Sequence, residues 1–200
     1  MNFPITLTSN NCTIFVYSQY EEPPCFAKGT KITLGDGTQK NIEDITYKDD
    51  LLVWDFYSGQ QRSIRPIYIQ PVHKFNLYSK VTLSNGTVLN LVGPNENKSH
   101  RLYNVEQNSF VYPQSFRKKD HTINKDGELL TIVSIEPIYE EVTYYNMITD
   151  TFYNLYAENI LTSCRISNRY GIENMKYNLE DVKMTQEKVD KYLERCFNDR

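Results

Sequence analysis

The sequence is poor in the features that mark several classes of protein. It has no H-E-x-x-H motif and no glycine-rich loop of the kind that holds phosphate. Its few cysteines lie far apart and form no C-x-x-C pair, which argues against a zinc site and against a dense disulfide framework. We therefore expect no metal and no cofactor, and a metal or small-molecule enzyme is the class with least support. The four cysteines are Cys12, Cys25, Cys164 and Cys196.

Long apolar runs and a strong charge of one sign are also missing. The N-terminus has no cationic stretch, and Thr, Ser and Asn interrupt its apolar residues, so neither a signal peptide nor a membrane span is expected. The formal net charge is −3, and the densest basic run is only Arg117 to Lys119. No attraction to nucleic acid or to anionic membranes follows from this balance. We expect an intracellular protein with neither kind of partner.

The middle of the chain has the pattern of an all-β domain. Hydrophobic residues make up 40% of the sequence, enough for a substantial core. Between Gly29 and about Leu161, runs rich in β-branched and aromatic residues alternate with turn signals. The expected strands are Leu51 to Trp54, Ile64 to Phe75, Val81 to Leu83, Thr87 to Val92 and Leu130 to Ile135. The expected turns are Gly35-Asp36-Gly37, Ser58-Gly59, Ser84-Asn85-Gly86 and Lys125-Asp126-Gly127.

Both ends differ from this middle part. Residues 1–24 form a leader that ends in Pro23 and Pro24, which stiffen the backbone and remove two hydrogen-bond donors. Residues 165–200 form a tail in which Val189, Leu193 and neighbouring apolar residues share one helical face, so this tail is expected to be mainly helical. The predicted organisation is a leader (1–24), a β domain (25–164) and a tail (165–200).

The segment from Cys25 to Asp55 carries an ordered set of short motifs. Cys25 is followed by a bulky residue, a G-T pair, a strand and a D-G pair. The run I-E-D-I, a turn with aspartate and a valine shortly before a further aspartate come next. The matching residues are Gly29-Thr30, Asp36-Gly37, Ile42 to Ile45, Asp49 and Val53 to Asp55. This order resembles the opening block of Hint domains, the fold shared by inteins and by the autoprocessing half of Hedgehog proteins.

Two later blocks continue the resemblance with substitutions. The run VTLSNGTVLNLVG resembles the hairpin before the T-x-x-H motif of that family, with His100 at the histidine position and Asn97 where threonine is usual. In the closing block, Asn146 stands for the usual aspartate, Ser163 for the penultimate histidine and Cys164 for the terminal asparagine. The resemblance implies a disc-like, all-β Hint domain whose two ends meet in the centre.

The resemblance also implies a chemistry. Cys25 would attack the carbonyl of Pro24 in an N-to-S acyl shift, so that the chain's own N-terminal segment is the substrate. His100 would protonate the departing amine, while Asn97 would steady the oxyanion and Asn146 would take the aspartate's place. The proline carbonyl is a hindered acyl donor, which predicts a slow reaction. With no terminal asparagine, full splicing is not expected, and Cys164 is a candidate acceptor of the thioester.

Plainer interpretations stay open beside this one. Cys25 can be a small buried hydrophobe, and Cys164 can be a core residue or a disulfide partner of Cys25. The other two histidines, His73 and His121, are expected to be ordinary loop or core residues. The whole domain can also be a noncatalytic Hint fold in a larger assembly, such as a viral particle. Frequent Asn, Tyr, Ile and Lys, with A- and T-rich codons, make a virus one expected source and a virion one expected location.

Overall fold

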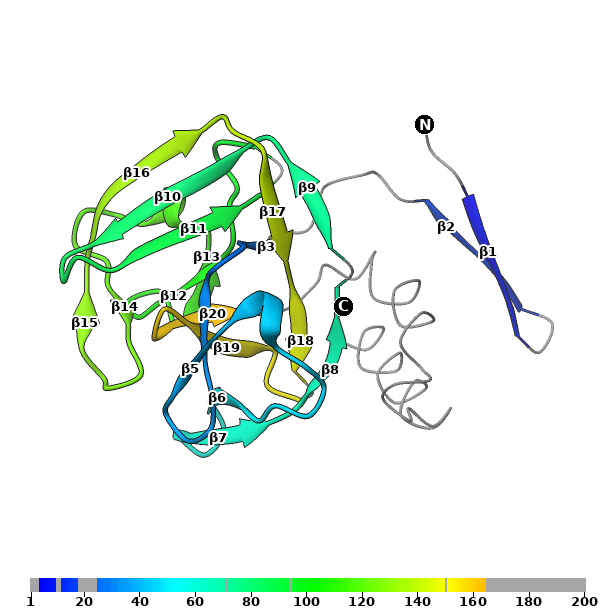
Figure 1. Cartoon of the computed structure of the whole chain (residues 1–200), viewed down its shortest axis with the longest axis horizontal. Coiled ribbons are helices and arrows are strands. Elements are labelled where there is room, and N and C mark those ends of the chain that lie inside the picture. The colour runs from blue at the N-terminus through cyan, green and yellow to red at the C-terminus, as the bar shows by residue number, and fades with distance from the viewer. Residues whose placement is uncertain are drawn as a thin grey trace.

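The computed structural model describes residues 4–9, 12–17, 25–70, 72–93, 95–149 and 151–164 (Figure 1). Among these residues the regular elements are β-strands, apart from two short 3-10 helices, η1 (Ile42–Asp44) and η2 (Pro113–Ser115). The prediction of an all-β domain is therefore confirmed. The helix predicted for residues 165–200 lies outside the described residues. In the N-terminal segment, β1 (Pro4–Ser9) and β2 (Cys12–Tyr17) form an antiparallel hairpin.

The first large sheet contains the strand that begins at Cys25. Its order is β16-β10-β11-β3-β17-β9, so β3 is an interior strand with a partner on each side. Antiparallel pairing joins Phe26 to Leu91 of β11 on one side and to Tyr145 of β17 on the other. The six strands are β16 (Ile132–Ile138), β10 (Tyr78–Leu83), β11 (Val88–Val92), β3 (Cys25–Ala27), β17 (Val142–Tyr145) and β9 (His73–Phe75).

The second large sheet contains the closing strand of the domain. Its order is β13-β12-β20-β19-β4-β5, and Thr162 of β20 pairs with Leu102 of β12. The six strands are β13 (Ser109–Val111), β12 (Leu102–Asn104), β20 (Ile160–Ser163), β19 (Asn154–Ala157), β4 (Lys31–Thr33) and β5 (Gln39–Asn41). This sheet therefore places the end of the domain beside the segment that follows His100.

Three antiparallel pairs complete the described part of the domain. β8 pairs with β18, which begins at Met147, shortly after β17 ends at Tyr145. The three pairs are β8 (Pro66–Ile69) with β18 (Met147–Thr149), β6 (Leu51–Asp55) with β7 (Gln60–Ile64), and β14 (Thr122–Ile123) with β15 (Leu129–Leu130). Figure 1 shows these strands curling around a common centre.

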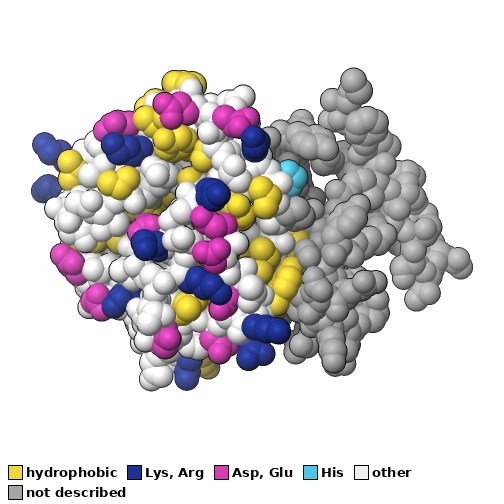
Figure 2. Space-filling view, viewed as in Figure 1, with side chains coloured by type: hydrophobic (Ala, Val, Ile, Leu, Met, Phe, Trp, Pro, Cys, Tyr) yellow, Lys and Arg dark blue, Asp and Glu magenta, His cyan; other side chains and the backbone are white. Residues whose placement is uncertain are grey.

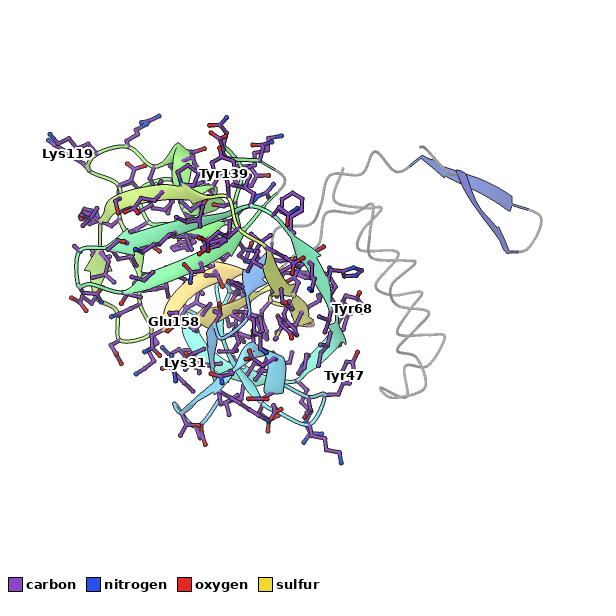
Figure 3. All side chains as sticks on the ribbon, turned by 45° about the horizontal axis from the view of Figure 1, so that its top comes forward. Lys31, Tyr47, Tyr68, Lys119, Tyr139 and Glu158 are labelled. Atoms are coloured by element: carbon purple, nitrogen blue, oxygen red, sulfur yellow. The ribbon has the colours of Figure 1, made fainter. Side chains whose placement is uncertain are left out.

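The turns lie where the sequence predicts them. Gly86 ends the tight connection between β10 and β11 with a φ of 85°, in the left-handed region that glycine adopts without strain. The hairpin β19–β20 turns instead at Glu158 and Asn159, with φ of 50° and 63°. The Glu158 carboxylate accepts a hydrogen bond from the backbone N–H of Lys31 at 2.7 Å, and Figure 3 shows these two residues close together. This contact fixes an otherwise strained turn.

Two of the expected strands are each divided between different strands in the structure. The run from Ile64 to Phe75 is not one strand, because its parts belong to β7, β8 and β9, which pair with different partners. The strand expected from Leu130 to Ile135 is divided, because Leu130 belongs to β15 and β16 runs from Ile132 through Pro137 to Ile138. β16 is an edge strand of its sheet, where proline's missing N–H leaves no ladder bond unmade.

The main hydrophobic core joins the two large sheets. Leu91 of β11, Ile32 of β4 and Leu155 of β19 are fully buried members of one cluster. Each such side chain contributes about 1.5–3 kcal/mol when it leaves water. Phe26 and Cys164 belong to the same cluster, so the first strand of the domain and its last described residue share one core. On the face shown in Figure 2, positive and negative side chains are interspersed over the surface.

Candidate functional site

Cys25 lies at the start of an interior strand and is completely buried. It pairs with Val92 of β11 and packs in a small apolar cluster with Val92 and Tyr144. Its thiol donates a hydrogen bond to the side-chain oxygen of Gln70, with 3.7 Å between Sγ and Oε1. The sulfur is thus held among strands instead of facing solvent, and it has a polar neighbour on one side.

His100 is also completely buried, and it contacts both ends of the domain. Its ring centroid lies 4.0 Å from that of Phe26, the residue after Cys25. Its Nε2 is 2.5 Å from the carbonyl oxygen of Ser163 at the end of β20. Because a carbonyl oxygen only accepts, Nε2 carries the hydrogen of this bond. In this tautomer Nδ1 is the ring nitrogen that can accept a proton. The predicted contact of His100 with the Pro24–Cys25 peptide involves a residue outside the described part.

The chain segment that leads to His100 crosses residue 93 so closely that this residue must be glycine. A Cβ placed on Gly93 would lie 1.8 Å from the carbonyl oxygen of Lys98 and 2.6 Å from Cα of Ser99. Neither backbone atom can move aside without moving its chain, so this crossing requires glycine. Ser99 is buried, and its hydroxyl donates to the Gln114 side-chain oxygen at 3.2 Å. These contacts fix the segment that delivers His100.

Asn97 does not belong to this buried cluster. Its side chain is exposed, and its backbone N–H donates to the side-chain oxygen of Asn95 at 3.0 Å, as in an Asx turn. The role expected for Asn97 at the oxyanion stays a prediction from the sequence.

Asn146 lies between β17 and β18, close to Cys25 in the first large sheet. The β3–β17 register pairs Phe26 with Tyr145, so one further step along both chains puts Asn146 opposite Cys25. Asn146 is completely buried, and its side-chain oxygen accepts from the N–H of Met147 at 2.9 Å. Its carbonyl oxygen accepts from the N–H of Gln70 at 2.8 Å. The structure thus brings Asn146, Cys25 and Gln70 together.

Cys164 is held in a polar contact at the end of the closing strand. Its backbone N–H donates to Tyr153, and its sulfur accepts from the N–H of Thr149 at 3.4 Å. The Thr149 hydroxyl donates its one hydrogen to the carbonyl of Asn154, so it accepts from the Cys164 thiol at 3.1 Å. Burial raises the pKa of Cys164 to about 11, although the two hydrogen bonds with Thr149 oppose this rise. The thiol is therefore neutral at neutral pH.

One of the open alternatives is now decided. Cys25 and Cys164 are not joined by a disulfide in the described part of the chain. Loop or core positions were expected for the remaining histidines. His121 lies in a loop, whereas His73 is exposed on strand β9. His73 stacks on Tyr144 with ring centroids 5.7 Å apart, and His121 pairs with Glu106. Both are distinct from the buried histidine that meets the closing strand.

Sequence reasoning missed the residues that strand β8 brings to the site. Gln70 follows β8 directly, and Tyr68 lies two positions earlier, on the same face of the extended chain. The Tyr68 hydroxyl is buried and has no hydrogen-bond partner among the described residues. Figure 3 shows Tyr68 on the same side of the domain as Tyr47, whose hydroxyl accepts from the N–H of Ile69 at 3.1 Å. No short motif marks Gln70, because only the pairing of distant strands places it beside Cys25.

Among the described residues, no group of three or more His, Cys, Asp or Glu side chains is arranged to hold a metal ion. The helices in that part of the chain are too short and too polar to cross a membrane.

The fold matches solved structures of inteins, although the sequence itself matches no protein-family model and no curated protein. The DnaB intein from Synechocystis sp. PCC 6803 has a TM-score of 0.58 and 15% identity, over 72% of this chain and 99% of the intein. A bacterial intein-like domain from Clostridium thermocellum gives 0.60 and 18%, over 70% and 97% of the two chains. The gp41-1 intein gives 0.54 and 20%, over 70% and 98%. This likeness establishes that the chain has the Hint fold of inteins.

Proposed function

We propose that residues 25–164 act as a Hint-type autoprocessing domain on the Pro24–Cys25 bond. The observation that carries the proposal is the position of His100, which contacts Phe26 beside the nucleophile and the Ser163 carbonyl at the opposite end of the domain. A buried histidine that contacts the residue after a buried cysteine provides an acid close to a nucleophile. The similarity to inteins supports the same function.

The proposed reaction moves one acyl group from nitrogen to sulfur. The Sγ of Cys25 forms a bond to the carbonyl carbon of Pro24, and the bond from that carbon to the nitrogen of Cys25 breaks. The proton that leaves the thiol ends on this nitrogen, so the products are a thioester and a free amine. His100 carries the proton between them through Nδ1, because Nε2 is engaged with Ser163. Each molecule reacts once.

The thioester is released by water or by an added thiol. Cys164 was one candidate for an internal acceptor. Its buried thiol is neutral at neutral pH and bound to Thr149, whereas the thiolate is the attacking form. The asparagine that cyclises in splicing inteins is replaced by Cys164, and the histidine before it by Ser163. Residues 165–200 are therefore proposed to stay attached after the N-terminal bond is cut.

Intact mass of the freshly translated chain tests the proposal. With dithiothreitol, the mass of residues 1–24 should be lost over time, and Cys25→Ala should prevent that loss. Pro24→Gly should accelerate the loss, because it removes the hindered acyl donor. Cys12→Ala is a matched control that removes a thiol from the leader.

The same experiment decides between the proposal and a scaffold. A chain that stays intact with dithiothreitol, and stays intact again with Pro24→Gly, contradicts self-cleavage. The domain would then be a noncatalytic Hint fold that acts through protein partners in an assembly. Exposed apolar side chains such as Val72 and Val133, at 60% and 66% exposure, would be the first surface to examine for such contacts.

A further inference from the structure

Gln70 is the polar side chain that touches the nucleophile. It is 6% exposed, and its Oε1 accepts the hydrogen of the Cys25 thiol at 3.7 Å. The apolar cluster around Cys25 includes Val92 and Tyr144, and the buried amide of Gln70 adds a hydrogen-bond acceptor for the thiol. This contact therefore affects the sulfur directly.

The backbone of Gln70 is fixed relative to the nucleophile. Its N–H donates to the carbonyl of Asn146 at 2.8 Å, and Asn146 directly follows Tyr145, which pairs with Phe26 next to Cys25. The preceding strand, β8, pairs with β18 up to its last residue, Ile69, which lies opposite Met147. The side-chain oxygen of Gln70 thus reaches Cys25 from an anchored position.

A hydrogen bond of this polarity favours one protonation state. The thiol donates and the amide oxygen accepts, so the bond exists only while the sulfur carries its proton. A bond made by the neutral form of an acid opposes its ionisation. Since the thiolate is the nucleophile, the contact holds Cys25 in its less reactive form.

Few other titratable groups surround the sulfur. Those packed around it in the described residues are Tyr68 from β8, Tyr78 from β10 and Tyr144 from β17, with His100 against the neighbouring Phe26. Burial raises the pKa of Tyr68, and histidine is the side chain that ordinarily titrates between pH 5 and 8. A substitution at residue 70 leaves all of these side chains in the chain, so it changes the surroundings of the sulfur only through residue 70.

We propose that Gln70 is a positioning residue that fixes the Cys25 sulfur and restrains its ionisation. The proposal rests on the proposed autoprocessing function and adds a control to it: the nucleophile is held neutral until its proton leaves through His100.

Two substitutions with opposite expected effects test this role. Gln70→Met keeps the length of the side chain and removes the acceptor, so the pH midpoint for ionisation of Cys25 should fall. Gln70→Glu keeps an acceptor and adds a negative charge, so the midpoint should rise by about one pH unit or more. The midpoint is read from the ¹³Cβ signal of labelled Cys25 in the uncut chain, assigned by comparison with Cys25→Ala.

The rate of dithiothreitol-dependent cleavage is the second measurement. At pH 7, Gln70→Glu should cleave about tenfold or more slowly than the unmodified chain, since each pH unit changes the thiolate fraction tenfold. Its pH profile should move to higher pH, while that of Gln70→Met should move to lower pH. Gln60→Glu, on exposed strand β7, adds the same charge at a distance and should move neither.

The two measurements separate this proposal from the function on which it rests. If the chain never cleaves but the NMR midpoints move in opposite directions, the function fails and the role of Gln70 stands. Midpoints that do not move, or that both move in the same direction, overturn the role of Gln70 whatever the cleavage result. If Gln70→Glu does not fold, the fall expected for Gln70→Met decides alone.

Discussion

Nε2 of His100 donates a hydrogen bond to the carbonyl oxygen of Ser163, at 2.5 Å. The proposed acid for the N-terminal bond is thus held by the C-terminal strand of the domain. A residue that binds both ends makes the chemistry depend on closure of the fold, because an unclosed domain has no fixed histidine. Cleavage before folding would then be suppressed.

Removing the His100 side chain should impair both chemistry and stability. His100→Ala is expected to slow dithiothreitol-dependent cleavage about 10²-fold or more, the usual contribution of a general acid. The lost hydrogen bond and the unpaired Ser163 carbonyl should lower the free energy of unfolding by about 1–3 kcal/mol. Intact mass over time and urea denaturation measure the two effects. His73→Ala, at an exposed histidine, is the control, and equal cleavage by both variants would refute the assignment.

A substitution at residue 93 should slow the reaction by shifting the segment that precedes His100. In Gly93→Ala the new Cβ meets the Lys98 carbonyl, so the segment before His100 must shift, and we expect a loss of about 1–3 kcal/mol in stability together with slower cleavage. Gly127→Ala is the matched control. That glycine has a φ of 83° and open space around it, so its substitution strains a turn far along the chain from His100. Thermal unfolding and cleavage rates should show both variants destabilised but only Gly93→Ala slowed.

The buried hydroxyl of Tyr68 should be dispensable for stability. It has no hydrogen-bond partner among the described residues, and burial raises its pKa. Tyr68→Phe is therefore expected to leave the free energy of unfolding unchanged or to raise it by about 1 kcal/mol. Tyr47→Phe is the contrast, because it removes the acceptor for the Ile69 N–H and should cost about 1 kcal/mol. Urea denaturation of both variants checks this, and a Tyr68→Phe protein as unstable as Tyr47→Phe would contradict it.

Acid should weaken the fold partly through Asp120. Its carboxylate accepts hydrogen bonds from Asn104, the Arg117 backbone and Gln107, and these bonds, that of Asn104 foremost, lower its pKa. A lowered folded-state pKa means that the stabilisation is complete above the unfolded value, about pH 4, and is lost as pH falls through the folded value. Asp120→Asn should therefore make the unfolding free energy less dependent on pH below about 4. Asp126→Asn, an exposed aspartate, is the control, and identical acid curves for the two variants would contradict this.

Much of the fold was accessible from the sequence because its signals are local. Alternating apolar residues and turns such as Asn85-Gly86 specify strands and their connections within a few residues. The ordered motifs after Cys25 led to the Hint fold that the solved inteins share. The extent of β16 through Pro137 was not accessible, since proline is tolerated there only because that strand lies at a sheet edge.

In the candidate site, too, some residues are marked by local motifs and others are placed only by the pairing of distant strands. Cys25, His100 and Cys164 were identified from the order of motifs, which is a property of the sequence alone. The neighbours of these residues were not, because Gln70 is 45 residues from Cys25 in sequence and Thr149 is 15 from Cys164. Strand pairing decides which distant side chains meet, and no local pattern encodes it. The sequence by itself determined the β architecture and singled out Cys25 as the candidate nucleophile. Tertiary structure decided that Asn97 is exposed, that Cys164 is buried as a neutral thiol, and that a glutamine binds the Cys25 sulfur.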